Sequence, residues 1–275
     1  MKKFLAALFF IATAFTFAQN RKLDSLWSVY KNKTFADTIR IRAFNAVIAG
    51  YRGSKPDTAL FLSQQLLEWA TRIKLPEYEV NALNGIGLAR MYKGDPVNAI
   101  DAFAKALKRA EASGNKKGIG DTYHNLGIVN QRQSDFPQAL QYYLKALQVR
   151  EEIGDRKGVA ASCVGIGIVY ANQSNQKKAL GYYLKGLKLY EAGGDKKGMD
   201  ACYNNIGGVY FAHGDYPKAL EFGLKALKIR EEIGDKQGAA NCHNNIGDIY
   251  FVQGNYSKAQ QYYLKALQQK KRARR

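Results

Sequence analysis

The sequence contains few of the residues that build disulfides, metal centres and redox sites. Only three cysteines and three histidines occur among 275 residues. An odd number of cysteines cannot pair completely. No cysteine or carboxylate accompanies a histidine at the spacing of metal ligands, and no phosphate-binding Gly-x-x-x-x-Gly-Lys-Ser/Thr motif is present. We therefore expect no metal, cofactor, catalytic residue or small-molecule substrate, and we predict that the protein is not an enzyme.

Long apolar runs are also scarce, because the only one extends from Phe4 to about Phe17, after Lys2 and Lys3. It is shorter than the ~20 residues that a membrane-spanning helix needs. Small residues stand at Thr16 and Ala18, where a signal peptidase requires them. We predict a cleaved signal peptide over residues 1–18 and export to the periplasm or the medium. An uncleaved anchor is the alternative.

Acidic residues are outnumbered, with 23 Asp and Glu against 42 Lys and Arg, for a formal net charge of +19. Such an excess of positive charge favours anionic partners and says nothing about the fold. Nucleic acid is not an expected partner, because the predicted export would separate the chain from it.

The chain does contain a repeat with a period of forty residues. A glycine recurs at this spacing at Gly87, Gly127, Gly167, Gly207 and Gly247. Fixed periods of about 20–50 residues are typical of solenoids, propellers and arrays. Within each period the apolar residues follow helical rather than alternating spacing, which predicts two helices per repeat.

Residues at equivalent positions of successive repeats, here called columns, mark where these helices begin and end. One column holds only Asp or Asn, the residues that cap helix N-termini: Asp95, Asp135, Asn175, Asp215 and Asn255. A glycine column suits the left-handed residue that closes a helix: Gly114, Gly154, Gly194 and Gly234. The columns predict a helix A over about 117–133 and a helix B over about 136–153, repeated every forty residues.

The repeat over 197–236 carries the pattern on which a family resemblance rests. Tyr203, Ile206, Gly207, Tyr210 and Ala219 stand at matching places of the tetratricopeptide repeat, which the chain resembles over about 37–271. The usual proline that closes helix B is replaced by glutamate, as in the forty-residue variant of kinesin light chains and the mitotic adaptor LGN. The resemblance implies an all-α, right-handed α-solenoid of about six stacked helix-turn-helix repeats.

The ends of the chain differ from its repeats. Residues 19–36 are predicted to form an N-terminal capping helix, because Leu23, Leu26, Trp27 and Tyr30 have helical spacing. The solenoid then covers 37–271, and 272–275 form a basic tail. The N-terminal part resembles the exported tetratricopeptide ectodomains of Gram-negative transmembrane regulators. This resemblance implies a sensor ectodomain or a fragment of one.

In tetratricopeptide proteins helix A lines the concave surface, and here asparagines recur just before the repeat glycine. An asparagine both donates and accepts hydrogen bonds, so it can bind the backbone of an extended peptide. The predicted groove comprises Asn84, His124, Asn125, Asn204, Asn205, Phe211, Asn244, Asn245 and Phe251. The alternative is that these asparagines cap or pack locally. The column after the glycine holds no cation, so a clamp for a terminal carboxylate is not expected.

A second candidate surface lies in the turns between repeats, where basic residues recur. This predicted basic ridge comprises Lys116, Lys117, Arg156, Lys157, Lys196, Lys197 and Lys236. Lipid headgroups, acidic glycans or acidic proteins are its expected partners, and solvated turn residues are the alternative interpretation. We predict an interaction scaffold that binds a protein or extended peptide in the groove, with an anionic-surface binder as the alternative function.

Two packing predictions follow from the register of the repeats. Cys163, Cys202 and Cys242 occupy closely equivalent positions in successive repeats. Packed helices lie about 8–10 Å apart, whereas a disulfide needs Cα atoms within ~7 Å, so no disulfide is expected. Gly207 is predicted to lie at a close approach of two helices, where a leucine would destabilise the fold.

Overall fold

The computed structural model describes residues 23–274, with side chains to residue 271. The predicted signal peptide and the basic tail's side chains therefore lie outside the described residues. Within 23–274 every regular element is a helix, and no helix is long and apolar enough to cross a membrane. The first helix covers 23–31. The others are α2 (Asp37–Tyr51), α3 (Pro56–Arg72), α4 (Pro76–Tyr92), α5 (Pro96–Ala112), α6 (Lys116–Arg132), α7 (Phe136–Glu152), α8 (Arg156–Asn172), α9 (Gln176–Ala192), α10 (Lys196–Ala212), α11 (Tyr216–Glu232), α12 (Lys236–Val252) and α13 (Tyr256–Arg274).

The predicted caps set these boundaries. Asp135 accepts a hydrogen bond from the backbone N–H of Gln138, at 3.1 Å, and so begins α7. The equivalent residues Asp95, Asn175, Asp215 and Asn255 do the same in their repeats. Gly154 follows α7 with φ +68°, a left-handed conformation that glycine adopts without steric cost. The helix boundaries predicted for one repeat are therefore confirmed to within one residue.

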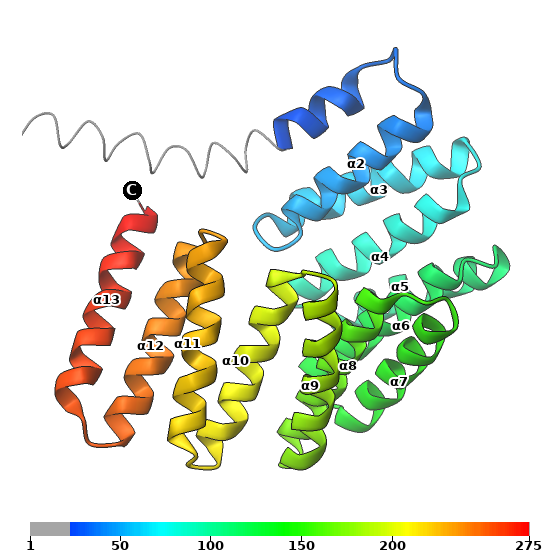
Figure 1. Cartoon of the computed structure of the whole chain (residues 1–275). Helices are drawn as coiled ribbons and strands as arrows, with labels where there is room; N and C mark the ends of the chain where they lie inside the picture. The colour runs from blue at the N-terminus through cyan, green and yellow to red at the C-terminus, as the bar shows by residue number, and fades with distance from the viewer. Residues whose placement is uncertain (1–22, 275) are drawn as a thin grey trace, which may run out of the picture. The chain divides into compact units, whose positions relative to one another are not determined.

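The chain divides into two compact units, residues 1–155 and 156–275. In the first unit each helix from α2 to α7 packs on the next, and α4 also contacts α2 and α6. In the second unit α8 to α13 pack in the same sequential manner, and α8 contacts α10. Figure 1 shows the helices of each unit as successive hairpins. Each unit therefore buries its apolar faces between neighbouring helices, as stacked repeats do.

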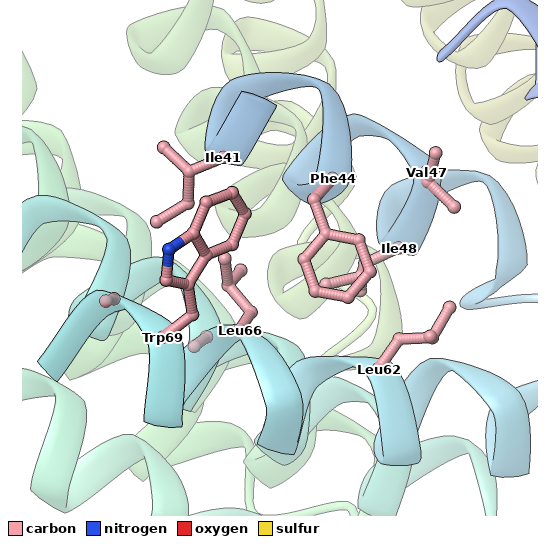
Figure 2. Packing of buried hydrophobic residues seen from close by; sticks show 9 residues of the cluster. Ile41, Phe44, Val47, Ile48, Leu62, Leu66 and Trp69 are labelled. Atoms are coloured by element: carbon pink, nitrogen blue, oxygen red, sulfur yellow. The ribbon is translucent and has the colours of Figure 1, made fainter. Parts of the chain in front are cut away.

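The first unit begins with an aromatic cluster. Phe44 and Trp69 lie at its centre among Ile41, Val47, Ile48, Leu62 and Leu66, as Figure 2 shows. Tyr30, from the helix over 23–31, stacks on Phe44 with ring centroids 4.3 Å apart. The predicted amphipathic N-terminal helix thus packs its apolar face against α2 and α3.

The repeat glycine lies beneath an aromatic ring of helix B in most repeats. A Cβ atom built on Gly127 would lie 2.6 Å from Cδ1 of Tyr143, and the same conflict arises between Gly167 and Tyr183. Phe103 covers Gly87 and Tyr263 covers Gly247 in the same way. Glycine is required there because any side chain would collide with the ring.

Gly207 also lies against helix B, as predicted, but no aromatic ring covers it. A Cβ atom on Gly207 would meet its nearest neighbours, Ala219 O and Phe222 Cβ, at 3.5 Å, which is ordinary van der Waals contact. The reason is that Gly223 stands where the other repeats carry the aromatic ring. Without that ring, the atoms nearest to Gly207 belong to the backbone and Cβ atoms of α11, at distances that an alanine would tolerate; the effect of a leucine stays a prediction.

The three cysteines form no disulfide, as predicted. Cys163, Cys202 and Cys242 are buried thiols in α8, α10 and α12. Burial raises the pKa of the Cys202 thiol to about 12 and that of Cys242 to about 11. These side chains therefore act as small buried hydrophobes rather than as reactive thiolates.

Candidate functional site

In the first unit the predicted groove residues are tied to one another across two repeats. Asn84, in α4, is buried, and its Nδ2 donates to Thr122 Oγ1 of α6 at 2.9 Å. Its Oδ1 accepts from Asn125 Nδ2 at 3.2 Å. Asn84 therefore joins the two A helices with both ends of its amide. Asn125, which is only partly buried, keeps acceptor capacity for a partner.

These residues form one wall of a polar pocket of about 280 Å³. Its lining comes from the end of α2 and from α4, α6 and α7: Arg52, Asn81, Asn84, Leu88, Asp121, His124, Asn125 and Arg150. Arg150 is almost fully buried and donates from Nη2 to Asp121 Oδ1 at 2.7 Å. Burial lowers the pKa of Arg52 from its ordinary value. The pocket therefore presents amide and guanidinium donors to an acceptor-rich ligand.

His124 is kept neutral in this pocket. The Tyr143 ring lies against the His124 ring, with centroids 5.3 Å apart. Burial lowers the pKa of His124 to about 3, and the charge of Arg150 acts in the same direction. His124 Nδ1 is buried without a hydrogen-bond partner among the described residues. A neutral imidazole in this position is a packing residue rather than a cationic contact for a ligand.

In the second unit the predicted groove residues separate into bound and accessible ones. Asn204 Nδ2 donates to the backbone oxygen and to Oδ1 of Asp200, at 3.0 and 2.9 Å, within α10. Asn245 on α12 is exposed, and Asn205 and Asn244 are partly buried. Phe251 is 54% exposed and meets Tyr256 edge-on. Asn245 and Phe251 are thus available to a partner, whereas Asn204 already serves the fold.

A second pocket, of about 260 Å³, lies between α10, α11 and α12. Its lining residues are Tyr203, Asn204, Gly207, Gly208, Phe211, Ala219, Gly223, Asn245, Asp248 and Ile249. The structure therefore brings three predicted groove residues, Asn204, Phe211 and Asn245, to one cavity. Most of the wall is apolar, and the polar groups of two asparagines and one aspartate stand among it.

The predicted basic ridge is partly neutralised by acids of the same repeats. Lys116 pairs with Glu152 at 3.2 Å and Lys196 with Glu232 at 2.8 Å, in each case between the start of helix A and the end of helix B. Lys157 pairs with Asp195 at 2.6 Å. The Lys116 and Lys196 pairs are exposed and are worth little in stability, but all three pairs reduce the positive field that the ridge presents to an anionic surface.

Within residues 23–274, no group of three His, Cys, Asp or Glu residues could hold a metal ion. The pockets offer hydrogen bonds, one paired and one unpaired guanidinium, and apolar walls. Their chemistry suits the binding of a ligand through shape and hydrogen bonds.

Comparison with known proteins identifies the family. A model of the tetratricopeptide repeat matches residues 78–152, 118–192 and 199–272. The chain belongs to the tetratricopeptide repeat family. Repeats of this family stack into scaffolds for protein–protein interaction, typically without catalytic activity, and the chain is such a scaffold. A search of curated proteins finds no match.

Solved structures show the same fold at low sequence identity. BtubC (BKLC) from P. vanneervenii is similar with a TM-score of 0.69 and 21% identity, covering 79% of this chain and 91% of the other. The apo form of RapI is similar over 98% of this chain and 99% of its own, with a TM-score of 0.67 and 17% identity. A Rap protein in complex with Competence and Sporulation Factor has a TM-score of 0.70 at 16% identity, over 94% and 73%. At these identities the likeness concerns the fold alone.

Sequence reasoning missed several pocket residues. Arg52 and Arg150 lie outside the asparagine column, so no repeat position marked them. Gly208 and Gly223 contribute by lacking a side chain, which a search for chemical groups overlooks. A signal for Gly223 was nonetheless present, because the other four repeats with the repeat glycine hold an aromatic residue at this place, at 103, 143, 183 and 263.

Proposed function

We propose that this protein binds extended segments of a partner protein along the A helices, and that each unit makes these contacts in its own pocket. The observation that carries the proposal is the 260 Å³ cavity of the second unit, where an apolar wall and the exposed Asn245 amide lie together. An extended peptide presents backbone donors and acceptors at regular intervals, and an asparagine amide can pair with both.

The polar pocket of the first unit supports the same function. Arg52 supplies donors there for backbone carbonyl groups or an acidic side chain of the partner, and the Asn125 amide oxygen can accept from a backbone N–H. The charge of +19 adds attraction for an acidic segment and accelerates the encounter at low salt. Small ligands are less suited to these pockets, because neither reaches the ~300 Å³ at which small-molecule sites begin.

Selection of displayed random peptides on the full chain tests this proposal. Bound peptides should lose affinity for Asn245→Ala by about two- to tenfold, since one neutral hydrogen bond contributes ~0.5–1.5 kcal/mol. Gln261→Ala, an exposed change on α13 of the same repeat, is the matched control and should leave affinity unchanged. The proposal is wrong if no peptide is enriched, or if the two variants behave alike.

The alternative is binding to an anionic surface through the basic ridge. The net charge of +19 favours it, and the ion pairs of Lys116, Lys157 and Lys196 weaken it. Replacing Arg156, Lys157, Lys196 and Lys197 by Gln separates the two functions. Groove binding should survive this change and moderate salt, because close contacts are screened less than surface charge. Loss of all binding after this change would support the ridge.

We also propose that the protein is exported and acts outside the cytoplasm, as a sensor ectodomain or as a fragment of one. The support is the order of Lys2-Lys3, the apolar run and the small residues at Thr16 and Ala18. N-terminal sequencing of protein recovered from the periplasm or medium should begin at Gln19. Soluble cytosolic protein that retains Met1 would contradict this proposal.

A further inference from the structure

Among the five repeats that carry the repeat glycine, one lacks the aromatic ring that the other four place over it. The ring position holds Phe103, Tyr143, Tyr183 and Tyr263 in four repeats and Gly223 in the repeat over 197–236. Phe103, Tyr143 and Tyr183 are almost completely buried. In these three repeats the ring is part of the packed interior, whereas Tyr263 is partly buried, and the absence of the ring at Gly223 changes the interior of its repeat.

The space that results is enlarged by two further glycines. Gly207 lies opposite Gly223, and a Cβ atom on it would meet only ordinary contacts at 3.5 Å, whereas a Cβ atom on Gly208 would have nothing within 4 Å. The column of Gly208 elsewhere carries Leu88, Ile128, Ile168 and Asp248. Three glycines thus converge on the 260 Å³ cavity between α10, α11 and α12.

The size of this cavity corresponds to one aromatic side chain. An apolar cavity of ~150 Å³ in another protein is large enough to bind benzene, and sites for drug-sized ligands begin at ~300 Å³. A cavity that holds a phenol ring with its Cβ atom needs a volume between these two limits. Gly207 stands at the place of Gly127, against which the Tyr143 ring rests in its own repeat.

A hydrogen-bond acceptor for a phenol stands in the cavity wall. Asp248 Oδ1 accepts a hydrogen bond of 2.7 Å from the hydroxyl of Tyr263, the ring of the next repeat. A carboxylate has about four acceptor positions, so Asp248 can accept a second hydroxyl from the cavity side. Tyr143 shows the same preference in its own repeat, because its hydroxyl donates to Gln131 Oε1 at 2.7 Å.

We propose that the cavity between α10, α11 and α12 binds an aromatic side chain of the partner protein, tyrosine in first place. The partner would supply the ring that Gly223 omits, packed on Gly207 and bonded to Asp248. This inference rests on the proposed peptide-binding function and specifies which side chain of the peptide enters the second unit.

The direct test uses 4-methylphenol, which is the tyrosine side chain itself, on the isotopically labelled full chain. Saturable shifts of the Gly207, Gly208 and Gly223 amide resonances are expected at millimolar concentrations. 4-Methylanisole cannot donate a hydrogen bond, so it should bind about two- to tenfold more weakly. In Asp248→Ala this difference between the two probes should disappear.

Blocking variants make the test specific. Gly223→Tyr restores the ring of the other repeats and should abolish the shifts while raising the melting temperature. Gly208→Ile fills the same cavity with the residue of Ile128 and serves if Gly223→Tyr does not fold. Gly181→Tyr is the matched control, because it places a tyrosine on α9 at an exposed site with open space around it. It should leave the shifts unchanged.

The possible outcomes distinguish a failure of the aromatic pocket from a failure of the proposed peptide-binding function. Absence of saturable shifts, or equal shifts in wild type and Gly223→Tyr, overturns the aromatic pocket. Peptides selected on the wild type should be enriched in tyrosine or phenylalanine and should lose at least tenfold in affinity for Gly223→Tyr. If selected peptides bind the wild type and Gly223→Tyr equally, the peptide-binding function is supported and the aromatic pocket is wrong. If 4-methylphenol binds but no peptide is selected, the peptide-binding function itself is wrong.

Discussion

The repeats over residues 117–156 and 197–236 have the same helices and caps, yet their interiors differ at one position. In the first, Tyr143 is 1% exposed and covers Gly127, whereas Gly223 in the second leaves a cavity beside Gly207. Asp135 and Asp215 cap the two B helices by the same hydrogen bond. The comparison shows that the repeat forms with the same caps and helices whether or not the ring is present.

The largest loss of stability is expected when the ring of the repeat over 117–156 is replaced by the glycine of the repeat over 197–236. Tyr143→Gly removes a buried ring, which typically costs about 3–5 kcal/mol, and adds the ~1 kcal/mol penalty of a helical glycine. Gln141→Gly, exposed on the same helix, should cost only that ~1 kcal/mol. Urea unfolding followed by circular dichroism measures both. Equal losses for the two variants would show that the ring does not stabilise the repeat.

The next effect concerns pH, because the Tyr143 ring covers His124. The pKa of His124 is about 3 in the folded chain and about 6.5 when unfolded, so the unfolded state binds more protons between these values. The contribution of His124 to the free energy of unfolding is therefore fully present above about pH 6.5, and the free energy of unfolding falls as the pH drops toward 3. The expected loss at pH 5 is about 2 kcal/mol.

The matched variant for this prediction is His124→Asn, which installs the residue that stands at Asn204 in the other repeat. Between pH 7 and pH 5 the variant should lose less free energy of unfolding than the wild type. The difference between the two losses should be about 2 kcal/mol. Unfolding curves at pH 7 and pH 5 measure the difference. An identical pH dependence in wild type and variant would mean that His124 is not kept neutral by burial.

The smallest effects compare the two repeat glycines. Gly127→Ala meets the Tyr143 ring, and such overpacking costs about 1–3 kcal/mol, offset in part by the gain of helix propensity. Gly207→Ala meets only ordinary contacts and should gain about 0.5–1 kcal/mol. The two changes in melting temperature should have opposite signs. A loss for Gly207→Ala would indicate that helices α10 and α11 are closer than the structure shows.

Much of the fold was predictable because its signals are local. Asp135 caps α7 and Gly154 closes it through contacts within a few residues, so a repeated column identifies both ends. The accessibility of the candidate groove residues was predicted less well. Asn84 was expected to face a peptide, but its amide joins α4 to α6 through Thr122 and Asn125. The hydrogen bonds of Asn84 depend on which residues the next repeat places opposite it. A column of equivalent residues does not contain that information.

The sequence by itself determined the family, the helix boundaries and the absence of disulfides, because period, capping and cysteine register act locally or repeat regularly. The tertiary structure decided which groups remain accessible. It placed Arg52 beside Asn84 and Asn125 in the first unit, and it brought Gly207, Gly208 and Gly223 together in the second. The physical reason is that a pocket depends on what neighbouring helices fail to fill, and this volume is set only when their side chains pack against one another.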